Sequence, residues 1–340
     1  MRREAKENLQ WAVPANGSRA IGASLLAIVI AMPSAAVAQT AAYPVKPVRV
    51  IVPFPAGGPV ETLTRVFTQR LAEVFGQPFI IDNRPGASGT LGSDVVAKAP
   101  RDGYTMLANN CSHTGNAAFY KKLPYDVLAD FAPVTQLDVT SGNLMVIHPS
   151  VPARTVKEFI AFAKTRPNQL NYASAGIGSP QHVSGAVFAS MAGIQLVHVP
   201  YKGNPPAFTD VVGGHVEVMF VTAGVARPYL PSGRLRALGI AGPQRLPTLN
   251  EVPTIQEAGL PGYNVICWHG MWFTAGTPPD IVRRVNAELV KALATPEAKR
   301  YLADADYFAT GTTPEEFAEF LRDDLPKQIG IAKTVGIQPQ

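Results

Sequence analysis

The chain has 340 residues, of which 46% are hydrophobic and 16% charged, a globular composition long enough for two medium-sized domains. The formal net charge of +5 is mild, and lysine and arginine do not cluster with aromatic residues, which argues against a nucleic-acid partner. The histidines are scattered without H-E-x-x-H or matching carboxylate spacing, so we expect neither a metal nor a cofactor.

The first 38 residues have the pattern of a secretory signal peptide. A basic, polar lead ends at Arg19, an apolar run extends from Ala20 to Val37, and Ala36-Val37-Ala38 matches the small-residue cleavage pattern. We expect cleavage before Gln39 and export of the mature chain. Because the lead is long, an uncleaved anchor is the alternative. No later stretch approaches the roughly 20 apolar residues of a membrane span.

Residues 48 to 76 predict a strand, a glycine-bearing loop and a helix. Val48 to Val52 is a short β-branched run typical of a buried strand, and Gly57-Gly58 allow a sharp turn after it. Pro59 suits the first helical position, and Gly76 is expected to end the helix. Such a loop exposes N–H groups at the positive end of a helix dipole, which favours an anion. The alternative is a plain turn, since neither nucleotide-binding fingerprint is present.

Strands and helices alternate through the next hundred residues. We expect a strand at 77–82, a helix at 90–99, a strand at 104–108 and then a polar tract at 109–116. This alternation indicates a mostly parallel sheet covered on both faces. In such sheets ligands bind at the carboxyl ends of the strands, where the glycine-rich and polar tracts fall.

The same pattern restarts near residue 144. Further strands are expected at 144–148, 170–173, 196–200, 216–220 and 235–240, followed by an extended aromatic stretch at 263–273 and helices at 278–294 and from 313. We therefore predict an α/β protein with two lobes, one made of residues 43–143 plus 267–340 and the other of 144–266. The two crossings would form a hinge, with a cleft between the lobes.

Cys111 and Cys267 are the only cysteines. Export permits a disulfide, but a chain with a core of this size does not need one, so we expect two separate, partly buried thiols. Two cysteines alone do not make a zinc site.

Loops rich in glycine, serine, asparagine and threonine follow several predicted strands, at 53–59, 109–116, 174–182 and 201–204. Their N–H groups and hydroxyls could hold a small carboxylate without a salt bridge. The alternative is an exported serine hydrolase that uses Ser179, three residues before His182, or Ser112. The chain has no G-x-S-x-G elbow, and a three-residue separation across a helix start is poor geometry for a nucleophile and its base.

Several short motifs run in order through residues 43 to about 330: VPFPAGG (52–58), NRPGA (83–87), DGY (102–104), KLPYD (122–126), GSPQH (178–182), VPYKG (199–203), Gly213-Gly214 and LRAL (235–238). With these motifs the chain resembles the substrate-binding receptors of tripartite tricarboxylate transporters, often called the Bug family. The resemblance implies a type II periplasmic binding protein, with two doubly wound α/β lobes joined by a two-strand hinge around a ligand cleft.

The resemblance also implies a non-catalytic, monomeric protein of the periplasm. It would capture a small organic carboxylate between its lobes and deliver it to the membrane permease subunits of the transporter. A receptor that reports its ligand to a signalling partner could have the same sequence, and stays open as an alternative.

The family's binding positions can be carried over residue by residue. The expected ligand-binding residues are Phe54, Ala56, Gly57 and Gly58 in the first loop, Asn110 and Ser112 after the third strand, Ser174, Gly178, Ser179 and His182 in the opposing loop, and Tyr201, Gly203 and Val221 in the second lobe.

Two positions depart from the family pattern. After the paired glycines the family usually has Pro-Thr-Asp-Thr, where this chain has Pro59-Val60-Glu61-Thr62. After the strand that ends at Phe220 an aspartate is common, where this chain has Val221. Both changes make the outer half of the pocket less polar. We therefore predict a ligand with an apolar or aromatic far end rather than a citrate-like polyacid.

Overall fold

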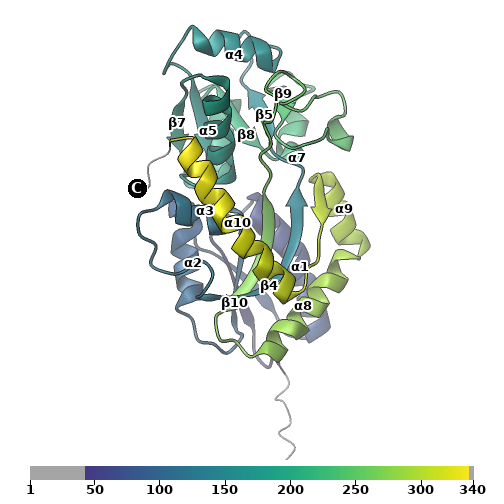
Figure 1. Cartoon of the computed structure of the whole chain (residues 1–340). Coiled ribbons are helices and arrows are strands. Elements are labelled where there is room, and N and C mark those ends of the chain that lie inside the picture. Colours follow the sequence, from purple (N-terminus) through teal and green to yellow (C-terminus); the bar gives the residue numbers. More distant parts are fainter. Residues whose placement is uncertain (1–42, 337–340) are drawn as a thin grey trace, which may run out of the picture. The chain divides into compact units, whose positions relative to one another are not determined.

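The computed structural model describes residues 43–336 (Figure 1). The predicted signal peptide and its expected cleavage site before Gln39 lie outside the described residues. Among the described helices, none is both long and apolar enough to cross a membrane.

The first sheet is mixed rather than mostly parallel. Its strands lie in the order β11 (Tyr307–Ala309), β4 (Phe131–Thr140), β10 (Trp268–Thr274), β3 (Thr105–Asn110), β1 (Val48–Val52) and β2 (Phe79–Asn83). Strand β1 pairs in parallel with β2 and β3, whereas β10 is antiparallel to β3 and β4. Parallel pairing is thus confined to the β-α-β part that the local patterns predict, and the chain returns late to add β10 in the opposite direction.

The second sheet repeats this mixed arrangement. Its strands lie in the order β7 (Val197–Pro200), β6 (Asn171–Ser174), β8 (Val218–Val221), β5 (Leu144–Ile147) and β9 (Arg236–Ile240). Strand β6 is parallel to β7 and β8, and β5 is antiparallel to β8 and β9.

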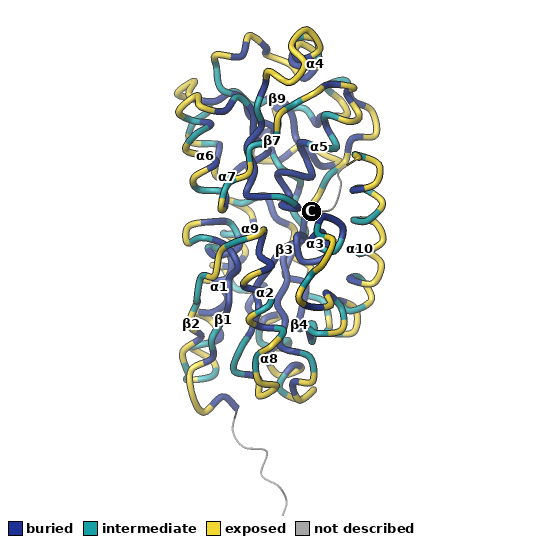
Figure 2. Tube along the Cα trace, turned by 90° about the vertical axis from the view of Figure 1, so that its left-hand side faces the viewer, coloured by how far each residue is buried: buried dark blue, intermediate teal, exposed yellow. Residues whose placement is uncertain are grey.

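Helices cover both faces of each sheet. Those around the first sheet are α1 (Pro59–Phe75), α2 (Thr90–Ala97), α3 (Ser112–Phe119), α8 (Pro279–Leu293), α9 (Pro296–Asp304) and α10 (Pro314–Thr334). Those around the second are α4 (Val156–Lys164), α5 (Pro180–Ala192), α6 (Asn204–Val212) and the short α7 (Ala223–Ala226). Alternation along β1 explains the two layers: Val48, Val50 and Val52 pack under α1 and α8, while Ile51 packs on the opposite side with residues of α2 and α10. In Figure 2 the central strands are accordingly buried and the outer faces of the helices exposed.

The helix boundaries follow local capping chemistry. Helix α1 begins at Pro59 and is ended by Gly76, whose φ of 65° is left-handed. Thr313 and Glu316 form a capping box at the start of α10. The tract 109–116, expected to be a polar loop, instead ends β3 and forms most of α3, because Asn110 lies in register with β10 and the helix is buried against its neighbours.

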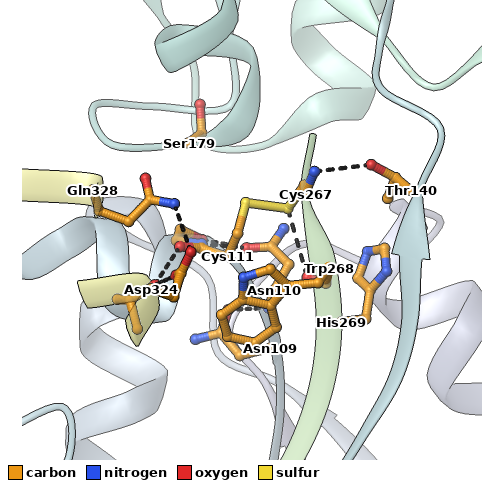
Figure 3. The surroundings of a disulfide bond; sticks show 12 residues. Asn109, Asn110, Cys111, Thr140, Ser179, Cys267, Trp268, His269, Asp324 and Gln328 are labelled. Atoms are coloured by element: carbon orange, nitrogen blue, oxygen red, sulfur yellow. Dashed lines mark hydrogen bonds between the residues drawn. A yellow bond between two sulfur atoms is a disulfide. The ribbon is translucent and has the colours of Figure 1, made fainter. Parts of the chain in front are cut away.

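The expectation of two separate thiols is wrong: Cys111 and Cys267 form a disulfide, with 5.4 Å between their α-carbons (Figure 3). Cys111 follows β3 and Cys267 precedes β10. These strands are antiparallel neighbours, and the N–H of Cys111 donates to the carbonyl of Trp268 at 3.0 Å. The two cysteines are therefore brought together by strand pairing that nothing local in the sequence reveals.

The same region carries the chain between the sheets. The connection from β4 to β5 passes through residues 141–143, and the return passes through 264–267. The two connections are tied where Thr140 N–H donates to the Cys267 carbonyl at 2.7 Å and Cys267 N–H donates to Thr140 Oγ1 at 3.0 Å. The disulfide thus anchors one connection to the first sheet.

Candidate functional site

A pocket of about 500 Å³, counted with its open mouth, is lined by residues from both sheets. From the first sheet come the loop after β1 and the ends of β3, β4, β10 and β11; from the second come the loop after β6, the start of α6 and the residue after β8. The strand ends that sequence patterns predict to bind a ligand therefore do meet in one place.

The pocket combines an apolar wall with uncharged polar groups. Phe54, Val60 and several prolines supply the apolar part, while Asn110, Gln181 and Asn204 supply side-chain amides. None of its described lining residues is a lysine, arginine, aspartate or glutamate. Helices α1, α5 and α6 begin at the pocket, so the positive ends of their dipoles converge there. Such a site suits a small anion with an apolar body.

The loop before α1 brings only some of its predicted binding residues to the pocket. Phe54 and Gly58 line the pocket, whereas Ala56 and Gly57 are exposed, with Gly57 on a shallower neighbouring depression. The N–H of Gly57 already donates to Glu61 Oε2 at 3.2 Å, and Glu61 is itself paired with Arg65. The carboxylate of Glu61 therefore occupies part of the anion-binding capacity of this helix start.

Ser179 and Ser174 are fully buried and do not line the pocket. Ser179 Oγ accepts the N–H of His182 at 3.3 Å and so caps α5. Gly178 donates its N–H to His182 Nδ1 at 3.1 Å. Lining residues that neighbour these positions, Ala175, Pro180 and Gln181, face the pocket instead. The predicted opposing loop therefore reaches the pocket, but its polar side chains of Ser174 and Ser179 lie behind the lining and support the loop.

A histidine pair lies beneath this loop. The rings of His182 and His198 stack with centroids 4.2 Å apart, and Ser174 Oγ is 2.6 Å from His198 Nε2. Burial, with a smaller contribution from His198, lowers the pKa of His182 to about 3, and burial lowers the pKa of His198 to about 4. Both imidazoles are neutral at physiological pH, so neither supplies a positive charge.

The remaining predicted residues divide between the pocket and its surroundings. Asn110 lines the pocket; its Oδ1 accepts from Ser112 N–H and from the Ser112 hydroxyl, which leaves the amide N–H groups for a ligand. Ser112 is fully buried behind it. Tyr201 lines an adjoining pocket that shares Phe54 with the first, and its hydroxyl donates to Asp210 at 2.6 Å.

Gly203 and Val221 lie behind the pocket lining. Gly203 is buried against Pro55, and Val221 belongs to the apolar core of the second sheet, while its neighbour Thr222 lines the pocket. Of the two departures from the family pattern, Val60 therefore touches the pocket directly and Val221 does not.

Sequence reasoning missed several pocket residues. His269 lines the pocket, and its Nδ1 is 2.8 Å from Oδ1 of the fully buried Asp138. Gln181 Oε1 and Asn204 Oδ1 are buried polar atoms that have no hydrogen-bond partner among residues 43–336. The Asp138–His269 pair could not be found locally because it joins residues 131 positions apart.

Comparisons with known proteins agree with this architecture. Residues 63–337 match the model of the tripartite tricarboxylate transporter family receptor. A protein of the tcbD–tcbE intergenic region of Pseudomonas sp. strain P51 is 38% identical, with 84% of this chain and 85% of that protein aligned. Protein BugT of Bordetella pertussis is 31% identical over 86% of this chain and 90% of its own length.

Solved structures of similar proteins agree with the family match. An R. palustris protein solved with adipate has a TM-score of 0.84 at 33% identity, covering 88% of this chain and all of the other. MatC from Rhodopseudomonas palustris, solved with bound malate, has a TM-score of 0.81 at 32% identity, covering 85% of this chain and all of the other. The predicted fold class is confirmed. The chain belongs to the family of tripartite tricarboxylate transporter receptors.

Proposed function

We propose that this chain is an exported periplasmic receptor that captures one small organic carboxylate in the pocket between its sheets and delivers it to a membrane permease. The observation that carries the proposal is the pocket itself: an uncharged, partly apolar cavity onto which three helix N-termini converge. Adipate and malate, the ligands of two similar structures, belong to the same chemical class.

We further propose that residues 43–143 with those from 267 onward form one lobe, that 144–266 form the other, and that the protein acts as a monomer. Strand membership supports this division, since the strands of the second sheet all lie between residues 144 and 240. Ligand would favour the closed arrangement by contacting both lobes at once.

The lining favours a ligand with an apolar far end. Phe54, Pro55, Pro59 and Val60 present carbon atoms to the cavity, and the charged groups that would partner a second or third carboxylate are absent from its described lining. We therefore propose a monocarboxylate, or an acid with widely spaced carboxylates, over a compact tricarboxylate.

A thermal-shift screen tests the proposal. The mature chain is heated with benzoate, phenylacetate, adipate, malate and citrate, and the midpoint rises for the acids that bind the native state. We expect stabilisation by at least one of the first three and less by citrate. Stabilisation by citrate alone would contradict the apolar preference, and stabilisation by none of a wide carboxylate panel would contradict the function.

We also propose that the chain has no hydrolytic role, because the hydroxyl of Ser179 caps a helix and is fully buried. Ser179→Ala should cost about 1 kcal/mol of stability through the lost cap and weaken ligand binding slightly. A reporter ester that the wild type cleaves and Ser179→Ala does not would overturn this.

A further inference from the structure

Asn110, His269 and Asp138 form a row across three neighbouring strands. His269 on β10 lies opposite Asn110 on β3 and opposite Asp138 on β4 in the register of the first sheet. Directly opposed residues share one face of a sheet, so the three side chains lie together. His269 is 3% exposed and Asp138 is completely buried. Because Nδ1 of His269 is held by Asp138, Nε2 is the ring nitrogen left for the pocket.

The charges around His269 are unbalanced. Asp138 Oδ2 has no hydrogen-bond partner within residues 43–336. Among the described residues that line the pocket, His269 is the only one whose side chain can carry a positive charge, and it is paired with Asp138. Tyr307 on β11 packs against the imidazole with the rings tilted and 5.1 Å between their centroids, and burial raises the pKa of Tyr307 well above the usual value, so it stays neutral.

The other titratable groups near His269 do not compensate the negative charge of Asp138. Tyr301 on α9, whose pKa is raised to about 12 chiefly by burial, is also neutral. Glu61 on α1 is satisfied by Arg65 and by the N–H of Gly57. Strand β3 contributes only the uncharged Asn110 opposite the ring. When His269 is neutral, a carboxylate entering the pocket therefore meets an uncompensated Asp138 carboxylate close behind the wall.

We propose that His269 binds the carboxylate of the ligand through Nε2–H and takes up one proton from solvent as the ligand arrives, with Asp138 as its positioning residue. The inference rests on the proposed function and identifies His269 as the positively charged group that binds the ligand carboxylate. On this proposal Nδ1–H donates to Asp138 before the ligand arrives, and Nε2 then carries a lone pair. The incoming proton is added to Nε2 and no other bond is broken. The filled site then holds two negative charges around one imidazolium.

Proton uptake makes affinity depend on pH. Over a pH range in which the imidazole is neutral in the free protein and protonated in the complex, binding consumes one proton and weakens roughly tenfold for each unit of pH increase, by linkage. The ligand is not the source of this effect above pH 6.5, because ordinary carboxylic acids are fully ionised there. Without such a step the dissociation constant would be flat over the same range.

Isothermal titration between pH 6.5 and 8.5 tests the inference, with benzoate and adipate as probes and benzamide as the uncharged comparison. Titrations in phosphate and in Tris, which differ in ionisation enthalpy, give the number of protons taken up. We expect measurable uptake, of at most one proton per carboxylate bound, and none for benzamide. This measurement needs only the wild-type protein, so it does not depend on the folding of a variant.

Variants then show which residue takes up the proton. His269→Gln keeps an N–H donor but cannot titrate, so its affinity for the probes should be weaker at pH 6.5 by tenfold or more and independent of pH. Asp138→Asn keeps an acceptor for Nδ1–H but removes the charge, so its proton uptake should fall at each pH. His215→Gln, at an exposed position after α6, is the matched control and should behave as the wild type.

The outcomes separate this inference from the proposed function. Carboxylate binding with no proton uptake in the wild type, or a pH profile that survives in His269→Gln, overturns the role of His269 and leaves the receptor function standing. Failure of every carboxylate to bind at any pH in the range overturns both.

Discussion

Gly203, behind the pocket lining, meets the lining residue Pro55, one from each sheet's loops. A β-carbon on Gly203 would lie 2.5 Å from both Cγ and Cδ of Pro55, closer than carbon atoms can approach. The φ of Gly203, 139°, is likewise open only to glycine. Gly176 makes a similar approach, because a β-carbon there would lie 2.7 Å from Ser88 Oγ. Both glycines allow loops of the two sheets to approach each other closely beside the cavity.

Gly203→Ala should therefore weaken ligand binding by tenfold or more, because the added methyl group holds the lobes apart at Pro55. The dissociation constant for the best-stabilising carboxylate, measured by titration calorimetry, checks this. Gly193→Ala is the control: its φ of 61° is also positive, but a β-carbon there has no neighbour within 4 Å. Equal losses in the two variants would show backbone strain rather than blocked closure.

Val60→Thr should shift ligand preference toward polar acids. Val60 is 4% exposed and lines the cavity, and threonine has nearly the same shape with one hydroxyl in place of a methyl group. We expect affinity for benzoate to fall by about 1 kcal/mol, or roughly fivefold, and affinity for malate to hold or rise. Val66→Thr, on the same helix away from the pocket, should leave the ratio of the two affinities unchanged. An unchanged ratio in Val60→Thr would show that this side chain does not select the ligand.

The disulfide should contribute substantially to stability. It closes a loop across 156 residues, and replacing both Cys111 and Cys267 by serine should lower the free energy of unfolding by about 3 kcal/mol. The expected fall in melting temperature is roughly 5–10 °C. Reductant should lower the melting temperature of the wild type and leave that of the double variant unchanged. Two titratable thiols in the non-reduced, denatured wild type would contradict the pairing.

Stability should decline as the solution is acidified below neutrality. Burial lowers the pKa of His113 and His198 to about 4 and, with His198, that of His182 to about 3. The unfolded chain protonates these groups from about pH 6.5 downward while the folded chain does not, so the unfolded state gains protons first. The contribution of these neutral histidines to the free energy of unfolding is therefore complete above about pH 6.5. It falls toward pH 4 by at most about 1.4 kcal/mol per pH unit for each histidine.

Urea denaturation at pH 7.0, 6.0 and 5.0 measures this slope in a range where most carboxylates remain ionised. His198→Gln should reduce the slope, because it removes one of the stacked rings. His215→Gln should not, because His215 is exposed. A free energy of unfolding that is constant from pH 7.0 to 5.0 would contradict the neutral, buried state of these imidazoles.

Local patterns predicted the β1–α1 unit well because its causes are local. The β-branched run, Pro59 and Gly76 each act on their own stretch of backbone, and the strand and helix begin and end where they indicate. Strand β4, in contrast, was not among the predicted elements. Its residues include Pro133, Gln136 and Asp138, and it forms only because β10 and β11 arrive from more than a hundred residues later.

The binding residues stay a prediction, and the structure shows where local patterns reach their limit. The predicted loops do meet at one pocket, but which side chains face it depends on how each loop is capped from within. Ser179 turns inward to cap α5, and Gln181 faces the cavity instead. His269 and Asp138 come together only through the pairing of β10 with β4, so no spacing in the sequence marks them.

A crystal structure of the mature chain with its best-stabilising carboxylate tests the central claim most directly. We expect the carboxylate at the starts of α1, α5 and α6, within hydrogen-bond distance of His269 Nε2, with the apolar part of the ligand against Phe54 and Val60. A ligand bound outside the cavity shared by the two sheets, or contacting one sheet alone, would contradict the account.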